Sequence, residues 1–304
     1  MSMPELPPVH RWEVSSPRGL VHIVHGMAEY GARYARLAAA LNAAGYTVWA
    51  HDHCGHGDHM RVDDGARLPG HFGDSDGWQR LLDDTTSVSQ ALQASSPGTP
   101  LLLFAHSMGS FVGQALLSQS GDRYRGVVLC GSNRPPGPLE RAGIGVARLE
   151  RRLRGPRTPS RWFQRVVFET YNRLFAPTRT EVDWLSRDAA EVDAYVADPL
   201  CGFPLTTQAW LDFLGGKSTL GDAPHLRRIP KALPVRLIAG DKDPVGEQGA
   251  GVRRLFDIYR ETGLTHVSLQ LYPNARHELV NETNRDEVTT DLIAWFEQVI
   301  AGLT

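Results

Sequence analysis

A serine flanked by small residues carries the clearest chemical signal in the sequence. Ser107 stands in the segment FAHSMG (residues 104–109), after the apolar run 101–104 and before apolar residues that recur at helical spacing. A strand that turns sharply into a helix at a serine presents the hydroxyl as a nucleophile, and Ala105 and Gly109 are small enough to let the two elements approach closely. A serine at an ordinary turn is the alternative interpretation. Partners farther along the chain favour a nucleophilic Ser107.

Those partners are an imidazole and two carboxylates. A serine hydroxyl is a weak nucleophile unless a base takes its proton and a third group orients that base. His277 follows the last predicted strand, and Asp241 and Asp243 follow the strand before it. The order Ser, Asp, His is that of the triad in α/β hydrolases. His277 would act first as general base and then as general acid, and an aspartate would hold the imidazole tautomer. We favour Asp243, which lies farther beyond the strand, and expect Asp241 to bind nearby backbone amides.

Backbone amides suited to a developing oxyanion occur at two places. The amide that follows the nucleophile, that of Met108, lies at an expected helix N-terminus, where N–H groups have no partner within the helix. A second amide is expected from His25-Gly26-Met27, which directly follows an apolar run, and we choose Met27. Gly26 is expected to permit an unusual backbone angle at this turn. Met27 and Met108 are therefore the predicted oxyanion-hole residues.

The predicted secondary structure places these residues at one edge of a sheet. Strands are expected over 9–14, 20–24, 46–50, 101–104, 126–130, 234–239 and 267–271, and helices over 33–44, 78–94, after Ser107, and over 288–303. Strands that alternate with helices predict βαβ units, and thus an α/β fold with a mainly parallel central sheet flanked by helices. Sites in such sheets lie at the carboxyl ends of the strands. The residues that directly follow a predicted strand, or lie in the loop beyond one, are His25, Asp52, Ser107, Asp243 and His277.

The alternation of strands and helices stops between Asn133 and about Lys231. The sequence PPGP (residues 135–138) stands at the entrance to this stretch, which is predicted to consist of helices and loops. We expect a helical cap at 133–231, inserted over the strand ends between two parts of one core, 1–132 and 232–304. The following residues are expected to line an acyl pocket or to form the cap's own small core: Trp162, Phe163, Trp184, Trp210, Phe213 and Leu214.

Composition and charge narrow the class of protein. The chain has 304 residues, of which 41% are hydrophobic and 22% charged, and its net charge is -2. These values are typical of a globular protein and give no reason to expect nucleic acid as a partner. The three cysteines have neither metal-binding nor redox spacing, which suggests reduced thiols. We see neither a signal peptide nor a membrane span and expect a cytoplasmic location, while the oligomeric state stays open.

Arginine is concentrated in the first part of the expected cap. Nine arginines face only two glutamates between residues 134 and 165, and Ile144, Val146, Leu149 and Leu153 are spaced as an apolar stripe. A basic amphipathic helix can lie on an anionic membrane surface, so we hypothesise peripheral membrane contact that collects lipid substrate. The solvated face of a core-packing helix is an equally good interpretation. The arginines are Arg134, Arg141, Arg148, Arg151, Arg152, Arg154, Arg157, Arg161 and Arg165.

Four histidines and two aspartates lie close together between residues 51 and 59. A binuclear metal motif of the H-x-H-x-D-H type would need an acid at position 55, where Gly55 stands. We therefore expect loop structure around Gly55 and Gly57, and no metal site. The residues concerned are His51, Asp52, His53, His56, Asp58 and His59.

Taken together, five motifs resemble the monoacylglycerol lipase and lysophospholipase branch of the serine α/β hydrolases, to which serine aminopeptidase-like hydrolases are related. The motifs are HGMAEY (25–30) with Arg33 and Tyr34, DHCGHG (52–57), HSMG (106–109), DKDPV (241–245) and RHE (276–278). The resemblance covers nearly the whole chain except the cap. It implies the α/β-hydrolase fold, a triad of Ser107, Asp243 and His277, and oxyanion donors at Met27 and Met108. It also implies hydrolysis of carboxylic esters of lipid-like substrates through an acyl-enzyme on Ser107, without a cofactor.

Two other functions fit parts of the sequence. A proline-type serine aminopeptidase would keep the same machinery but would need acidic groups in the cap to bind a free amino terminus. A non-catalytic binding protein would keep the fold, although it has no need for all three triad residues. The acidic residues that leave the aminopeptidase open are Glu169, Glu181, Asp183, Asp188, Glu191 and Asp193.

Overall fold

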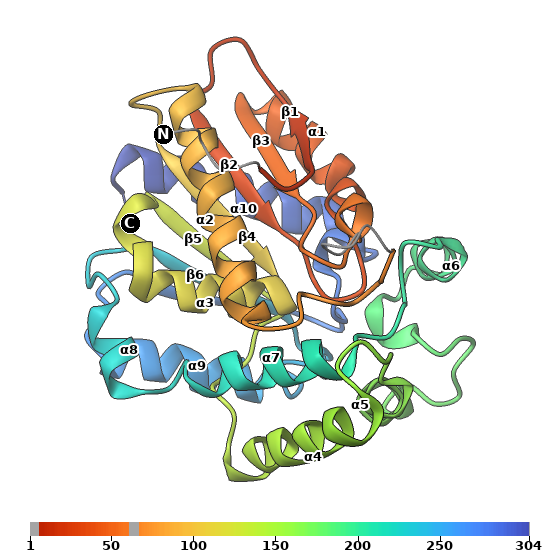
Figure 1. Ribbon diagram of the computed structural model, residues 1–304. Coiled ribbons are helices and arrows are strands. Elements are labelled where there is room, and N and C mark those ends of the chain that lie inside the picture. Colours follow the sequence, from red (N-terminus) through yellow and green to blue (C-terminus); the bar gives the residue numbers. More distant parts are fainter. Residues whose placement is uncertain (1–5, 61–66, 304) are drawn as a thin grey trace.

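A seven-stranded sheet forms the centre of the computed structural model, which describes residues 6–60 and 67–303 (Figure 1). The strand order is β1-β3-β2-β4-β5-β6-β7, and every neighbouring pair is parallel except β1 and β3. The predicted α/β fold with a mainly parallel sheet is confirmed. The strands are β1 (Val9–Trp12), β2 (Gly19–Val24), β3 (Tyr46–His51), β4 (Leu101–His106), β5 (Gly126–Cys130), β6 (Val235–Gly240) and β7 (Val267–Tyr272).

Helices cover both faces of this sheet, which explains why the central strands are almost continuously apolar. Alternate residues of β4 point to opposite faces. Leu103 packs in the same cluster as residues of α2 (Gly77–Ser95), α3 (Met108–Ser120) and α9 (Ala250–Glu261). Phe104 packs on the other face with residues of α1 (Ala35–Ala43) and α10 (Arg285–Ala301). The sheet is thus held rigidly between two apolar layers.

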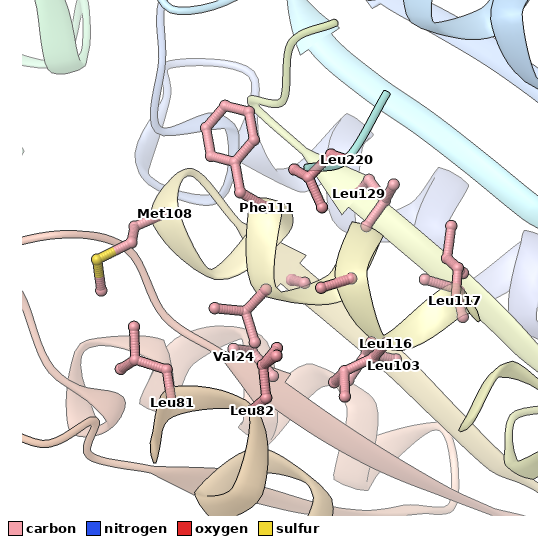
Figure 2. Close-up of a cluster of buried hydrophobic side chains, with 14 of the residues drawn as sticks. Val24, Leu81, Leu82, Leu103, Met108, Phe111, Leu116, Leu117, Leu129 and Leu220 are labelled. Carbon is pink, nitrogen blue, oxygen red and sulfur yellow. The ribbon is translucent and has the colours of Figure 1, made fainter. Parts of the chain in front are cut away.

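The helix that follows Ser107 is packed especially tightly. Leu116 of α3 is fully buried in the same cluster as Leu103 of β4 and Leu81 and Leu82 of α2 (Figure 2). Removing such a buried leucine side chain typically costs about 2–5 kcal/mol. This packing fixes the start of α3, and with it Ser107, relative to the strand ends.

Between β5 and β6 the chain leaves the sheet and forms a second layer of helices. Helix α7 contacts α2 of the core and α4 of this outer layer, while α8 packs against α3. In Figure 1, α4 and α5 lie below α7, and α6 lies to one side. The domain limits 133 and 231 stay a prediction. The helices are α4 (Pro138–Arg154), α5 (Arg161–Arg173), α6 (Ala189–Ala197), α7 (Thr207–Ser218) and α8 (Ala223–Arg228).

The predicted strands agree with the structure to within one or two residues, with small differences elsewhere. Strand β1 ends at Trp12 rather than 14, because the Val14 N–H donates to the Thr47 hydroxyl (3.1 Å) instead of continuing the ladder with β3. The helix expected at 33–44 is a 3₁₀ turn (Gly31–Tyr34) followed by α1. Helix α9 was not predicted from the sequence. Further 3₁₀ turns are Gly57–His59, Gly121–Arg123, Asp183–Leu185 and Leu279–Asn281.

Candidate active site

Ser107 occupies a strained turn between β4 and α3. Its backbone angles are φ 52° and ψ -119°, a conformation that residues other than glycine rarely adopt. The Ser107 N–H donates to the Cys130 carbonyl at the end of β5 (2.9 Å). A Cβ atom on Gly109 would lie 2.4 Å from the Val24 carbonyl oxygen, so only glycine fits there. The close approach expected from the small residues is therefore present, and the hydroxyl is presented at the sheet edge.

His277 and Asp243 form a buried pair at the same edge. His277 Nδ1 lies 2.9 Å from Asp243 Oδ1, so a proton on Nδ1 is donated to the carboxylate. Oδ1 also accepts the Val245 N–H at 2.9 Å. Both side chains are at most 2% exposed, which strengthens their interaction. Asp241 instead accepts the Asn274 N–H (2.7 Å), as predicted for a turn aspartate. Asp243, not Asp241, thus lies beside the imidazole.

Two backbone contacts bring the His277 imidazole and Ser107 to neighbouring positions. A Cβ atom on Gly131 would lie 2.9 Å from His277 Cε1 and 3.1 Å from Nδ1, so the ring rests directly on the chain after β5. The residue before Gly131 is Cys130, whose carbonyl binds Ser107. Both side chains also line the same cavity. The structure therefore brings together Ser107, Asp243 and His277, which come from three distant parts of the sequence.

The loop that carries Met27 lies against the serine turn. A Cβ atom on Gly26 would lie 3.1 Å from Ser107 Cβ and 2.7 Å from a Glu29 carboxylate oxygen. Glycine is thus required for space, and the expectation of an unusual angle at Gly26 is wrong. The positive φ of this loop falls on Ala28 (φ 55°) instead. Met27 and Met108 both line the cavity at Ser107, and their role as oxyanion-hole residues stays a prediction.

Neighbouring charges adjust the basicity of the imidazole. Burial opposes protonation of His277, but the carboxylate of Asp243, aided by Glu278 and Glu29, outweighs it and raises the pKa of His277. The ring of His106 lies 4.7 Å from that of His277, and burial followed by the nearby His277 holds the pKa of His106 well below its usual range. His106 is therefore neutral at physiological pH, and His277 is the better base.

Arg33, Glu29 and Glu278 form a buried charge network next to this site, to which the sequence analysis gives no role. Arg33 binds Glu29 and, with both terminal nitrogens, Glu278. Burial alone would raise the pKa of Glu278, but Arg33 lowers it to about 2. Burial raises the pKa of Glu29. Two signals were present in the sequence: Glu278 directly follows His277, and Glu29 stands four residues before Arg33, a spacing typical of ion pairs.

Ser107 opens into a cavity of about 420 Å³. Of the six residues predicted for an acyl pocket, all but Trp162 line it; Trp162 is 53% exposed. Polar groups near the reacting residues include Glu29, Glu278 and the Tyr195 side chain. The remaining apolar wall comes mainly from α5, with single residues from α3, α4 and the 3₁₀ turn Asp183–Leu185. These residues are Phe111, Ile144, Val167, Phe168, Tyr171 and Leu185. A long apolar chain fits such a lining.

The histidines and aspartates near residue 51 form hydrogen bonds that hold the surrounding loops together. The Asp52 carboxylate accepts the N–H groups of Gly31 (2.8 Å) and Asp58 (2.9 Å). His25 Nε2 accepts the His53 N–H at 3.0 Å. Burial holds the pKa of both histidines well below the usual value. Within residues 6–60 and 67–303, no group of three or more His, Cys, Asp or Glu side chains is arranged to hold a metal ion.

A nucleophile turn of this backbone geometry, placed at the carboxyl edge of a parallel sheet, is the mark of the α/β hydrolases. The family model described as "Serine aminopeptidase, S33" matches residues 15–284. The chain belongs to this family of α/β hydrolases, and the predicted resemblance is confirmed.

Individual relatives agree with this assignment. A monoacylglycerol lipase of Mycolicibacterium smegmatis is 29% identical over 288 residues, covering 92% of this chain and 89% of the relative. The monoglyceride lipase of Mus musculus is 26% identical, with 96% and 86% covered. A solved carboxyl esterase from Bacillus coagulans, in complex with glycerol, superposes with a TM-score of 0.85 at 26% identity, covering 96% of this chain and 99% of that one. The predicted enzyme class, a carboxylic ester hydrolase, is confirmed by these comparisons.

Proposed function

We propose that the protein hydrolyses carboxylic esters of monoacyl lipids, such as monoacylglycerols or lysophospholipids, through an acyl-enzyme on Ser107. His277 takes the Ser107 proton as the hydroxyl attacks the acyl carbon, and then gives it to the leaving alcohol. Asp243 holds the imidazole tautomer and stabilises imidazolium. The amides of Met27 and Met108 bind the oxyanion. Water then attacks the acyl-enzyme while His277 takes its proton. His277 returns that proton to Ser107 as the carboxylic acid leaves. The observation that carries the proposal is that His277, which is paired with Asp243, lines the same cavity as Ser107.

The cavity lining supports a lipid ester. Apolar side chains from Phe111, Phe163, Trp210 and Phe213 suit an acyl chain. Polar oxygens at the reacting end, above all those of Glu29 and Glu278, suit the hydroxyl groups of a polar alcohol, because a carboxylate accepts hydrogen bonds readily. The residues between 133 and 231 would then act as a cap, since α4, α5 and α7 contribute much of the apolar wall.

Asp188, Glu191 and Asp193, three of the six acidic residues that left an aminopeptidase open, bind arginines away from the cavity. Arg285 binds Asp188, Arg36 binds Glu191 and Arg179 binds Asp193. Among the described residues that line the cavity, none belongs to the predicted set Glu169, Glu181, Asp183, Asp188, Glu191 and Asp193. A free amino terminus would find Glu29 and Glu278, but Arg33 already neutralises part of their charge. Ester hydrolysis is therefore the better supported activity.

A panel of substrates with a nucleophile variant tests the proposal. Monoacylglycerols, lysophospholipids, short p-nitrophenyl esters and aminoacyl anilides are offered to the wild type and to Ser107→Ala. We expect hydrolysis of the monoacyl lipids and p-nitrophenyl esters, and a loss of about 10⁴-fold or more in kcat for the variant with an unchanged circular dichroism spectrum. Preferred cleavage of the anilides, or full activity of Ser107→Ala, would contradict it.

We further propose that α4 and α5 touch the membrane surface from which the substrate is taken. Val146, Leu149 and Leu153 of α4 and Trp162 and Val166 of α5 are 44–74% exposed, and we call these five residues the cap patch. Ile144 of the predicted stripe turns inward to the cavity instead, because it lies on the opposite side of the helix from the other three. Arg148, Arg152, Arg161 and Arg165 are exposed on the same two helices. Within the described chain, no helix is both long and apolar enough to span a bilayer.

Vesicle co-sedimentation tests this contact. We expect wild-type protein to sediment more with vesicles that contain phosphatidylglycerol than with pure phosphatidylcholine, and Leu149→Ser/Leu153→Ser to lose most of this binding. Val196→Ser serves as control, because Val196 is 58% exposed but lies on α6. Equal sedimentation with both vesicle types, or undiminished binding of the double variant, would count against the proposal.

A further inference from the structure

Arg33 lies between two buried carboxylates that belong to the two loops beside Ser107. Its Nη1 donates to Glu29 Oε2 (2.7 Å) and to Glu278 Oε1 (2.8 Å), and its Nη2 donates to Glu278 Oε2 (2.8 Å). The three side chains are only 4–11% exposed. The bidentate pair with Glu278 uses the planar fork of the guanidinium, a geometry that lysine cannot reproduce.

Glu29 connects Arg33 to the loop that carries Met27. Its Oε1 accepts the Gly26 N–H (2.5 Å) and the Tyr34 hydroxyl (2.9 Å). Gly26 in turn lies against Ser107, as the 3.1 Å from its Cβ position to Ser107 Cβ records. A shift of the Glu29 carboxylate would therefore move the backbone next to the nucleophile.

Glu278 connects Arg33 to the loop that carries His277. It directly follows His277, its Oε2 accepts the Asn281 side-chain amide (2.9 Å), and its N–H donates to the Leu185 carbonyl (2.8 Å). Because Glu278 directly follows His277, holding the Glu278 carboxylate in place also constrains the backbone of His277. Arg33 therefore holds both loops through a single side chain.

Tyr195 adds a third contact to this junction. The Arg33 guanidinium lies 4.9 Å from the centre of the Tyr195 ring, and the Tyr195 hydroxyl donates to the Ala28 carbonyl (3.0 Å). Glu29, Glu278 and Tyr195 line the cavity, whereas Arg33 is not among its described lining residues. Arg33 therefore lies behind the groups that face the substrate and acts through them.

We propose that Arg33 is a positioning residue for acyl transfer, which keeps the Met27 loop and the His277 loop in register across Ser107. This inference rests on the proposed function. Arg33 also offsets part of the charge of the two carboxylates, which without it would stabilise imidazolium at His277 still more. The titratable groups that face His277 are Asp243, Glu278, Glu29 and His106. Arg33 supplies a positive charge next to two of these groups, Glu29 and Glu278.

Three variants separate geometry from charge. Arg33→Lys keeps the charge but loses the fork, so we expect kcat for a soluble p-nitrophenyl ester to fall about 10-fold, with KM within about twofold and an unshifted acid limb of the pH profile. Arg33→Gln loses both, so kcat falls about 100-fold and the acid limb moves to higher pH. Glu278→Gln removes a negative charge near His277, so the acid limb moves to lower pH. Opposite shifts of this kind are not produced by a general loss of structure.

Controls keep the test independent of folding and turnover. Arg18→Gln removes an exposed ion pair with Glu297 and should leave kcat and the acid limb unchanged. Circular dichroism establishes which variants fold; if Arg33→Gln does not, Arg33→Lys and Glu278→Gln carry the test. NMR titration of His277 reads its pKa whether or not an ester is turned over. Wild-type kcat in a folded Arg33→Lys, or a His277 pKa that does not fall in Glu278→Gln, would overturn the inference. Failure of the proposed function appears separately, as an inactive wild type or a fully active Ser107→Ala.

Discussion

Gly131 and His277 are in direct contact: a methyl group on the glycine would lie 2.9 Å from Cε1 of the imidazole. The glycine follows β5, and the histidine lies in the loop beyond β7. The imidazole therefore occupies the space that a side chain at position 131 would fill. A residue with no side chain therefore helps to place the proposed general base.

Replacing this glycine should displace the imidazole. We expect Gly131→Ala to lower kcat about 100-fold with little change in KM, because a small misplacement of a catalytic group has an effect of that size. The change is measured by steady-state kinetics on a soluble p-nitrophenyl ester. Gly98→Ala is the matched control: both glycines have positive φ (58° and 85°), but a Cβ atom on Gly98 would meet nothing within 4 Å. Equal kinetic losses in both variants would show that backbone strain, not contact with His277, is responsible.

The two aspartates after β6 should differ sharply in their effect on catalysis. Asp243→Asn removes the carboxylate that faces His277 Nδ1 and should lower kcat about 10⁴-fold, since the imidazole would lose its orienting acceptor. Asp241→Asn changes a turn residue and should leave kcat within about threefold of wild type. Steady-state kinetics on one ester distinguishes them. The choice of Asp243 fails if Asp241→Asn is the more damaging substitution.

The pH profile should reveal the electrostatic setting of His277. The imidazole accepts the Ser107 proton only when it is neutral, so kcat/KM rises as pH increases through its pKa. Asp243, Glu278 and Glu29 raise that pKa above 6.5 against the effect of burial. We therefore expect the acid limb of kcat/KM to have its midpoint above pH 6.5 for an ester that does not ionise. A midpoint clearly below pH 6.5 would mean that burial dominates instead.

Stability should depend on the packing of α3 against the sheet. Leu116 is fully buried in the cluster of Figure 2, and Leu116→Ala should lower the free energy of unfolding by about 2–5 kcal/mol. Leu303 is 77% exposed, so Leu303→Ala should change it by less than about 0.5 kcal/mol. Urea unfolding followed by circular dichroism measures both. A Leu116→Ala midpoint equal to that of Leu303→Ala would exclude α3 packing as a main source of stability.

Much of the fold could be predicted because its signals are local. The apolar runs of β2, β4 and β5 are short and bounded by turn residues, so strand limits were found to within one or two residues. Helix α9 was overlooked, although Leu255 and Tyr259 are buried at a helical spacing. The predicted stripe on α4 is wrong at Ile144, because residues two positions apart, such as Ile144 and Val146, project from opposite sides of a helix.

The sequence by itself determined the order of strands and helices, the serine at a strand–helix turn, and the aspartate and histidine beyond later strands. These follow from residue type and neighbours along the chain. Only the tertiary structure decided that Asp243, favoured from the sequence over Asp241, does meet His277, that Gly131 supports the ring, and that Arg33, which binds Glu29, also binds Glu278, 245 positions farther along the chain. Such contacts arise because the parallel pairing of the strands brings their carboxyl ends to one edge of the sheet. A local sequence pattern does not show which side chains touch there.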